Sequence, residues 1–235
     1  MQTGAEVHRL AVIPARGGSK RIPRKNIRAM SGRPLMAWAI ETALASGEFD
    51  EVTVSTDDDE IARIAESIGA TVPFRRPAAL ADDHASTASV IAHATSEMRR
   101  QGLAPDLVCC LYPAAIFVTA DDLAGARRLL ETSTRPYAAA VVRYSHPIQR
   151  ALALDEGGEL TPVDPEGLAM RTQDLPSRWH DAGQFYWGRT DAWVAGQPIL
   201  PNAVGYPLAE GSVVDIDTEE DWRVAERLHS VKLRS

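Results

Sequence analysis

The sequence predicts an α/β sandwich with a mostly parallel sheet, and two observations carry this expectation. Short apolar runs alternate along the chain with stretches whose apolar residues recur at helical spacing. The run at residues 106–112 (DLVCCLY) is apolar enough for a strand that is covered on both faces, as strands of parallel sheets are. The chain has 235 residues, which suits one full domain with a large core.

The elements follow one another in order along the first part of the chain. Strands are expected at residues 10–13, 51–55, 71–74, 106–112 and 137–144. Helices are expected between them, at residues 34–46, 57–68, 86–100 and 121–132. Gly47 and Gly69 directly follow the first two of these helices, where glycine commonly ends a helix.

Four prolines interrupt the pattern between residues 145 and 177, and short β segments such as residues 148–154 are expected there. The pattern then returns to strands at residues 184–187 and 212–216, and Thr218 is placed to cap a final helix, with Asp221 three residues later. We therefore expect a single domain over residues 8–235, with residues 145–180 as an inserted β-rich arm.

Composition excludes several classes of protein. The 25 Lys and Arg against 32 Asp and Glu give a net charge of −7, which argues against a general nucleic-acid binder. No apolar run reaches the roughly 18 residues that a membrane span needs, and the first residues do not resemble a signal peptide. The adjacent Cys109 and Cys110 are expected to be buried thiols rather than part of a disulfide framework. These observations favour a cytoplasmic protein that binds neither nucleic acid nor membranes.

A basic, glycine-containing loop follows the first expected strand, at residues 15–26 (ARGGSKRIPRKN). Ligands of open α/β sheets bind beyond the carboxyl ends of strands, and adjacent glycines let the backbone approach a phosphate closely. Arg16, Lys20 and Lys25 can neutralise a polyphosphate. Residues 9–33 hold eight Lys and Arg and no acidic residue, so positive charge is concentrated here. A phosphate site is therefore favoured over a solvated basic loop, although the P-loop and dinucleotide-binding motifs are both missing from the sequence.

Asp215 and Asp217 form a D-x-D pair near the end of the chain. Alternate residues of a strand point to one side, so the two carboxylates are expected to converge on a hard cation such as Mg²⁺. The alternative is one capping and one exposed aspartate, and a D-x-D is also typical of metal-dependent glycosyltransferases. The acidic residues 57–60 are expected mainly to stabilise the start of a helix.

Residues 14–26 (PARGGSKRIPRKN) resemble the N-terminal signature of the cytidylyltransferases that activate nonulosonic acids, the CMP-sialic acid synthetase family. The resemblance extends over residues 13–228, with support at residues 49–62, 75–83 and 213–222. The stretches HPIQRAL, RTQDL and HDAGQFYWG are most similar to members that act on pseudaminic acid. Residues 112–117 (YPAAIF) depart from the family, which usually carries a hydroxyl residue and a later proline there.

The resemblance implies a Rossmann-like nucleotidyltransferase (nucleotide-diphospho-sugar transferase) fold, Mg²⁺ as cofactor, and a homodimer formed through the arm. It implies the reaction of CTP with a 2-keto nonulosonic acid to give a CMP-sugar and diphosphate. Sialic, legionaminic and 3-deoxy-octulosonic acids are alternative substrates. A D-x-D glycosyltransferase and a non-catalytic nucleotide-binding module are alternatives of other classes.

The resemblance also implies roles for individual residues. Transfer would depend on Arg16 and Lys25 at the α-phosphate and Lys20 at the leaving phosphates, with Asp215 and Asp217 at the metal. The nucleotide would be bound by Ala15, Gly17, Gly18, Ser19, Asn26, Arg76, Ala85, Ser86 and Thr87, although Ser86 and Thr87 could equally be plain helix-capping residues. The acidic sugar would be bound by Gln149, Arg150, Arg171, Gln173, Gln184 and Tyr186. Catalysis by His180 is expected less than a structural hydrogen bond with Asp181.

Overall fold

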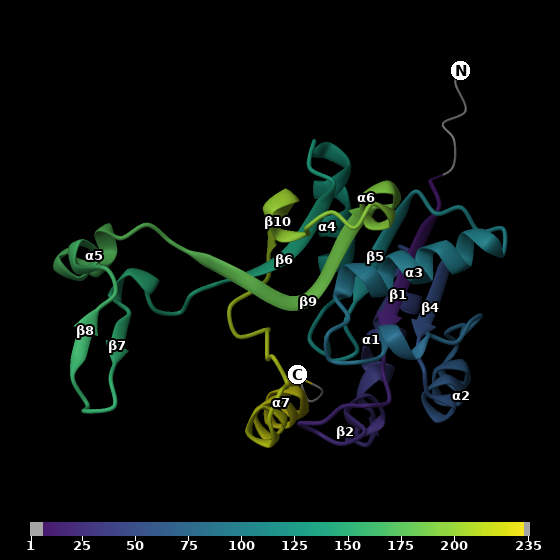
Figure 1. Ribbon diagram of the computed structural model, residues 1–235, viewed down its shortest axis with the longest axis horizontal. Coiled ribbons are helices and arrows are strands. Elements are labelled where there is room, and N and C mark those ends of the chain that lie inside the picture. Colours follow the sequence, from purple (N-terminus) through teal and green to yellow (C-terminus); the bar gives the residue numbers. More distant parts are fainter. Residues whose placement is uncertain (1–6, 233–235) are drawn as a thin grey trace.

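A mixed six-stranded sheet forms the centre of the molecule, in a computed structural model that describes residues 7–232 (Figure 1). Its strand order is β10-β6-β9-β5-β1-β4. Five of the strands run parallel, and β9 alone runs antiparallel, between β5 and β6. The strands are β1 (Arg9–Pro14), β4 (Glu51–Ser55), β5 (Leu107–Leu111), β6 (Tyr137–Arg143), β9 (Trp179–Arg189) and β10 (Ala203–Pro207).

Helices cover both faces of this sheet (Figure 1). One face packs against α1 (Leu35–Ser46), α2 (Asp59–Ile68) and α4 (Ala120–Thr132), and the other against α3 (Thr87–Arg100) and α6 (Thr190–Val194). Strand β5 is buried along its whole length, with Cys109 in the first core and Cys110 in the second. The prediction of an α/β sandwich with a mostly parallel sheet, and of a central strand covered on both faces, is thereby confirmed.

The last helix, α7 (Glu219–Lys232), packs against the N-terminal part of the chain. Ile216 and Trp222 share a buried cluster with Ile22 and Met30, beside the small hairpin of β2 (Ala29–Met30) and β3 (Arg33–Pro34). The expected cap is present, since the Asp221 amide donates to Thr218 Oγ1 at 3.2 Å and the Thr218 amide donates to Asp221 Oδ2 at 2.8 Å. The first and last segments of the chain are therefore packed together.

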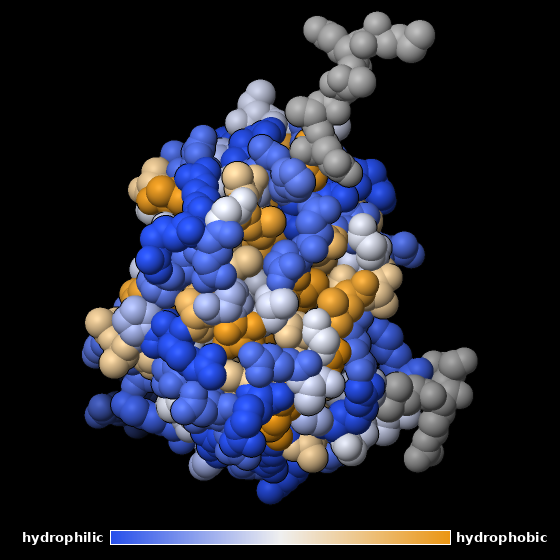
Figure 2. Space-filling view, turned by 90° about the vertical axis from the view of Figure 1, so that its right-hand side faces the viewer, coloured by the Kyte–Doolittle hydropathy of each residue, from blue (hydrophilic) through white to orange (hydrophobic). Residues whose placement is uncertain are grey.

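An arm extends away from the sheet, beyond the start of the long strand β9 (Figure 1). It contains the hairpin of β7 (Leu152–Leu154) and β8 (Leu160–Pro162) and the short helix α5 (Pro165–Ala169). On the side of the molecule opposite the arm, Figure 2 shows mainly hydrophilic residues with small groups of hydrophobic ones between them. Within residues 7–232, no helix has the length and apolar character needed to cross a membrane.

Two expected strands are wrong. Residues 71–74 contribute only one bridge, between Thr71 and Thr53, because Pro73 lacks the backbone donor that would continue the pairing. Residues 212–216 form no strand, and their apolar side chains pack instead against core clusters at the end of the sheet. The edge strand beside β6 is instead β10, a half-exposed segment whose sequence shows little alternation of apolar and polar residues.

Candidate active site

The basic loop after β1 is anchored on the acidic residues that begin α2. The Gly17 amide donates to Asp57 Oδ1 at 3.0 Å, and the Arg24 guanidinium pairs with Asp58 at 2.5 Å. A Cβ on Gly17 would lie 2.8 Å from Asp58 Oδ2, so a larger residue there would displace the Asp58 side chain. Asp58 also caps α2, and its hydrogen bond with Arg24 lowers its pKa to about 2. The acidic run therefore stabilises the helix as expected and also anchors the loop, which the sequence did not reveal.

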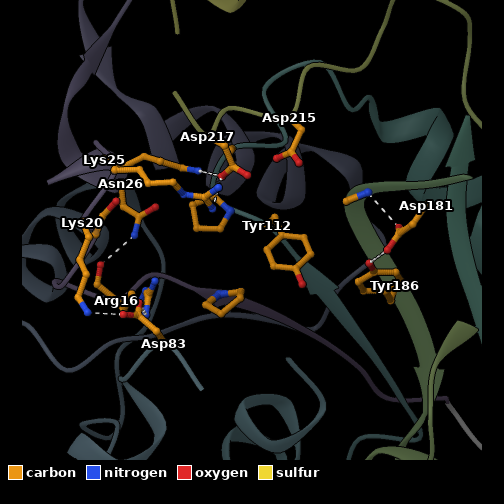
Figure 3. Close-up of a pocket in the computed structure, with 16 residues that line it drawn as sticks. Arg16, Lys20, Lys25, Asn26, Asp83, Tyr112, Asp181, Tyr186, Asp215 and Asp217 are labelled. Atoms are coloured by element: carbon orange, nitrogen blue, oxygen red, sulfur yellow. Dashed lines mark hydrogen bonds and ion pairs between the residues drawn. The ribbon is translucent and has the colours of Figure 1, made fainter. Parts of the chain in front are cut away.

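A cavity of about 670 Å³ opens where β1 and β5 end (Figure 3). Ser19, Arg16, Lys20 and Lys25 of the loop line it, together with Asn26, whose amide nitrogen donates to the Arg16 carbonyl at 3.0 Å. The structure thus brings the three expected catalytic cations to one cavity. Three other loop residues that were expected to bind the nucleotide do not line the cavity. Ala15 is fully buried, and its backbone amide donates to the Ser55 carbonyl at 3.0 Å. The other two are Gly17 and Gly18.

Two of these cations bind a carboxylate of the same chain. Asp83 lies 2.7 Å from Arg16 Nη1 and 2.5 Å from Lys20 Nζ, and these contacts lower its pKa. Arg16 also donates to the Asp82 carbonyl at 2.9 Å. An anion therefore lies where the sequence predicts phosphates. Sequence reasoning assigned no role to Asp83, although it belongs to the family-like segment at residues 75–83.

Lys25 joins the loop to the D-x-D segment at the other end of the chain. Its ammonium donates to the Ile216 carbonyl and lies 3.6 Å from Asp217 Oδ1. Burial lowers the pKa of Lys25, while Asp217 and Asp215 act in the opposite direction. Arg21 also pairs with Asp217, at 2.8 Å. The loop cations and the C-terminal carboxylates therefore form one charged network.

Asp215 and Asp217 both line the cavity, although no strand presents them as expected. Burial raises the pKa of Asp215, and the neighbouring Asp217 raises it further. A divalent cation would relieve this repulsion, and two carboxylate oxygens beside a phosphate site are a donor set that Mg²⁺ uses. No group of three or more metal-binding side chains occurs in the described part of the chain, so further ligands would come from substrate oxygens or water.

A smaller cavity of about 180 Å³ adjoins the first and shares Arg16, Asp83 and Tyr112 with it. Arg76, which is 5% exposed, lines it and donates through Nε to Ser55 Oγ at 3.1 Å. Burial lowers the pKa of Arg76 to about 10. A buried arginine at the base of a small pocket is placed to recognise the polar edge of a ligand.

Three residues at the start of the next helix were expected to bind the nucleotide, and two of them line this smaller cavity. Ala85 and Thr87 line it, and the Thr87 hydroxyl lies 2.5 Å from that of Tyr112. Ser86 does not line it and accepts the Ser89 amide at 3.1 Å instead, which is the capping alternative. Tyr112 lies in the stretch that departs from the family, and sequence reasoning gave it no role.

The six residues expected at the sugar lie in two places. Four of them are on the arm and line neither of these two cavities. There Gln149 donates to the Pro176 carbonyl at 3.0 Å, Arg150 donates to the Met170 carbonyl at 2.7 Å, Arg171 pairs with Asp174 at 3.3 Å, and Gln173 is exposed. Gln184 is buried in the body, with its amide nitrogen bonded to the Ala182 carbonyl at 3.0 Å.

Tyr186 lines the main cavity and donates a hydrogen bond to Asp181. His180 bonds through Nδ1 to the Asp181 carbonyl oxygen at 2.9 Å, and its ring packs on Tyr144 with the ring centroids 4.6 Å apart. These contacts correspond to the structural alternative for His180. Asp181, in contrast, faces the cavity beside Tyr186 (Figure 3).

Curated proteins of known activity match nearly the whole chain. A pseudaminic acid cytidylyltransferase of Campylobacter jejuni (serotype O:2) is 41% identical over 227 residues, covering 96% of this chain and 98% of that protein. A CMP-N,N'-diacetyllegionaminic acid synthase of Legionella pneumophila is 31% identical and covers 93% and 95% of the two chains. N-acylneuraminate cytidylyltransferase B of Danio rerio is 32% identical, and the match covers 94% of this chain but 51% of that longer protein.

Solved structures show the same fold. A CMP:2-keto-3-deoxy-manno-octonic acid synthetase complexed with CTP superposes with a TM-score of 0.71 at 18% identity, covering 96% of this chain and 99% of that one. A 4-diphosphocytidyl-2C-methyl-D-erythritol synthase gives a TM-score of 0.68 at 12% identity. The family model described as "Cytidylyltransferase" matches residues 10–193, which hold the basic loop, Arg76 and the Asp181–Tyr186 pair. The chain therefore belongs to the cytidylyltransferase family and is a nucleotidyltransferase.

Proposed function

We propose that this enzyme catalyses the reaction of CTP with pseudaminic acid to give CMP-pseudaminic acid and diphosphate, in the synthesis of nonulosonic acid glycans such as those of flagellin or surface polysaccharide. One observation carries the chemistry: Arg16, Lys20 and Lys25 converge with Asp215 and Asp217 on one cavity. The choice of sugar is supported by the curated relatives, since two pseudaminic acid cytidylyltransferases of Campylobacter jejuni are 41% and 40% identical to the chain.

In this reaction the anomeric hydroxyl of the sugar attacks the α-phosphorus of CTP and gives up its proton to solvent. The bond between the α-phosphorus and the oxygen bridging to the β-phosphate breaks, and diphosphate leaves with that oxygen. Phosphoryl transfer of this kind depends mostly on positioning and on charge stabilisation. Arg16 and Lys20 would bind the triphosphate once their contacts with Asp83 are released. Lys25 would stabilise charge at the α-phosphate from its fixed place beside Asp217.

We propose Mg²⁺ as the cofactor, held by Asp215 and Asp217. When bound, the cation would neutralise phosphate charge and lower the pKa of a coordinated hydroxyl. Lys25 orients the segment that carries both carboxylates through its hydrogen bond to the Ile216 carbonyl. The small cavity beside Arg76, Ala85 and Thr87 would receive the cytosine and ribose.

We further propose that the arm forms a homodimer with a second copy of the chain. The arm exposes large apolar side chains in and directly after its hairpin, among them Leu154 (68%), Leu160 (60%) and Val163 (66%). A two-stranded hairpin is marginally stable alone, and exposed apolar patches mark interaction surfaces. Dimerisation would bring the arm residues Gln149, Arg150, Arg171 and Gln173 near the partner's cavity. The buried, free Cys109 and Cys110 fit a cytoplasmic protein, and the net charge of −7 fits one that does not bind nucleic acid.

The test is the release of diphosphate from CTP and Mg²⁺ with pseudaminic, sialic, legionaminic and 3-deoxy-octulosonic acids in turn. Pseudaminic acid is expected to give the highest kcat/KM. A higher value with another acid would assign the enzyme to that substrate, and no diphosphate with any of the four would reject the proposed function. A D-x-D glycosyltransferase would consume a sugar nucleotide without releasing diphosphate.

A further inference from the structure

The segment that carries Asp215 and Asp217 is held in place by contacts outside the sheet. Among the described residues 7–232, no β-ladder includes residues 212–217, so strand pairing does not fix where the two carboxylates lie. Helix α7 begins directly after this segment, at Glu219. The position of both aspartates therefore depends on how the start of α7 is attached to the rest of the protein.

Arg28 attaches the first turn of α7 to the end of the basic loop. Its Nη1 donates to Glu219 Oε1 at 2.5 Å, and its guanidinium carbon lies 4.3 Å from the centroid of the Trp222 ring. Trp222 is 2% exposed and shares a buried cluster with Ile216. A planar guanidinium can stack on an aromatic ring while its N–H groups bind a carboxylate, which an ammonium cannot do with the same geometry. One side chain therefore holds this helix turn at two points.

Arg28 and Lys25 belong to one hydrogen-bonded turn, and both contact the C-terminal segment. Residues Lys25–Ile27 form a 3-10 turn, and the Arg28 amide donates to the Lys25 carbonyl at 3.3 Å. Lys25 donates to the Ile216 carbonyl and is directed toward Asp217 (Figure 3). The contact of Lys25 with Ile216 and that of Arg28 with α7 each join residues 191 positions apart, so the two segments lie in matched register. A shift of Arg28 would therefore be passed on to Lys25 and to the segment that it contacts.

We propose that Arg28 is a positioning residue for the reaction, and that its contacts with the first turn of α7 hold Asp215 and Asp217 at the cavity. This inference rests on the proposed function and deepens it. Arg28 does not line the main cavity, and in this assignment it contacts neither the nucleotide nor the sugar. Its effect reaches the site through the backbone that it fixes. Changing the partners that orient ligating side chains typically costs about 10–100-fold in metal affinity or activity.

The test compares Arg28→Gln with the wild-type enzyme in three measurements. In an activity titration, the half-saturating Mg²⁺ concentration should rise about tenfold. In hydrogen-exchange mass spectrometry without substrate or metal, the backbone amides of residues 213–218 should exchange about tenfold faster, because the start of α7 opens more easily. The calorimetric Kd for CTP in EDTA should change by less than about twofold, because Arg16 and Lys20 keep their places.

Two conservative variants separate the contributions of the ion pair and the stacked ring. Glu219→Gln removes the ion pair and leaves Arg28 stacked on Trp222, whereas Arg28→Lys keeps the charge without the planar stacking. Both should raise the Mg²⁺ requirement and the exchange rate by less than Arg28→Gln does. If Arg28→Gln fails to fold, these two variants decide the question.

Arg33 offers a matched control, because it makes the same two kinds of contact without reaching the D-x-D segment. Its Nη1 donates to Glu41 Oε2 at 2.6 Å, and its guanidinium carbon lies 5.2 Å from the centroid of the Trp38 ring. Arg33→Gln should leave the Mg²⁺ requirement and the exchange of residues 213–218 unchanged. Equal effects in Arg33→Gln and Arg28→Gln would overturn the assignment. So would faster exchange in Arg28→Gln with an unchanged Mg²⁺ requirement, which is the result expected of a merely structural contact.

Failure of the proposed function and failure of this role give different results. A wild-type enzyme that releases no diphosphate with any acid would reject the function. An active wild type with an Arg28→Gln variant that is unaffected in both Mg²⁺ requirement and exchange would reject the positioning role alone.

Discussion

Asp83 Oδ1 lies 2.7 Å from Arg16 Nη1, so a carboxylate of the protein pairs with one of the cations that the reaction needs to bind phosphate. The second oxygen of Asp83 contacts Lys20, and the Asp83 side chain is 38% exposed. An exposed ion pair is weak because water and salt screen it. A triphosphate carries more charge than a carboxylate and can therefore take over both cations.

Asp83→Asn should strengthen CTP binding. Exposed ion pairs contribute little to stability, so releasing Arg16 and Lys20 should lower the Kd for CTP modestly, by up to about fivefold. Isothermal titration calorimetry with CTP measures this directly. Asp59→Asn, which removes an exposed partner of Arg75 outside the cavity, is the control and should leave the Kd unchanged. Weaker CTP binding by Asp83→Asn would show that Asp83 assists the nucleotide instead.

Lys25→Met should abolish most of the activity. Removing one preorganised donor from a transition state typically costs about 10²–10³ in kcat, and Lys25 also holds the Ile216 carbonyl. Steady-state kinetics at saturating CTP and sugar measure the loss. Circular dichroism should show a folded protein, because Lys25 lies at a cavity and not in the apolar core. A variant with near wild-type kcat would remove Lys25 from the mechanism.

Asp215→Asn should raise the concentration of Mg²⁺ needed for activity. One of two carboxylates loses its charge, so we expect the half-saturating Mg²⁺ concentration to rise about tenfold or more. The measurement is an activity titration after removal of metal with EDTA, which should itself abolish diphosphate release in the wild type. Asp217→Asn should have the same effect and should also free Arg21 and Lys25 from their partner. Activity that persists in EDTA would contradict the metal assignment.

Asp58→Ala should lower the free energy of unfolding by about 1–2 kcal/mol at neutral pH, because it removes the cap of α2. The pKa of Asp58 is lowered from 3.8 to about 2 in the folded state, so the charged form contributes stability above pH 3.8. This contribution is lost as the pH falls toward 2. Urea unfolding at pH 7 and at lower pH values should show the difference between wild type and variant shrinking with acid.

Asp58→Asn separates the two roles of this side chain. Asparagine caps helices about as well as aspartate, so its effect on stability should come mainly from the lost charge opposite Arg24. A difference between wild type and Asp58→Ala that does not depend on pH would contradict the charged contribution.

The double variant Leu154→Glu, Leu160→Glu should convert a dimer to a monomer. Both side chains are exposed within one chain, so the substitutions should leave the fold intact while placing charges in the proposed interface. Light scattering at micromolar concentration measures the change in mass. Leu200→Glu, at another exposed leucine (51%), should leave the mass unchanged. A wild-type protein that is already monomeric would reject the dimer.

The alternating pattern was sufficient to predict the sheet and most helices. Strand β5 is an example, since DLVCCLY could be buried on both faces only in a sheet with helices on both sides. The edge strand β10 and the loop at residues 212–216 were not predictable, because their conformations depend on tertiary contacts rather than on local periodicity. The length of β9 was also missed, since its first residues extend into the exposed arm.

The site was predictable where charge is concentrated in the sequence. The loop at residues 15–26 and the D-x-D pair were both found, and the structure brings them to one cavity. Asp83 and Asp181 were given no functional role because isolated aspartates carry no pattern, and only the fold brings them beside Arg16 and Tyr186. The arm residues Gln149 and Arg150 bond to the backbone of the arm itself, which no linear motif could indicate.

The contact of Lys25 with Ile216 joins residues 191 positions apart in the chain. On the ribosome, the basic loop is therefore made well before the segment that completes its charge network. A growing chain cannot assemble this network until residues 215–217 have been synthesised. CTP, which stabilises only a state that it binds, would thus favour chains that carry this segment over chains truncated before it.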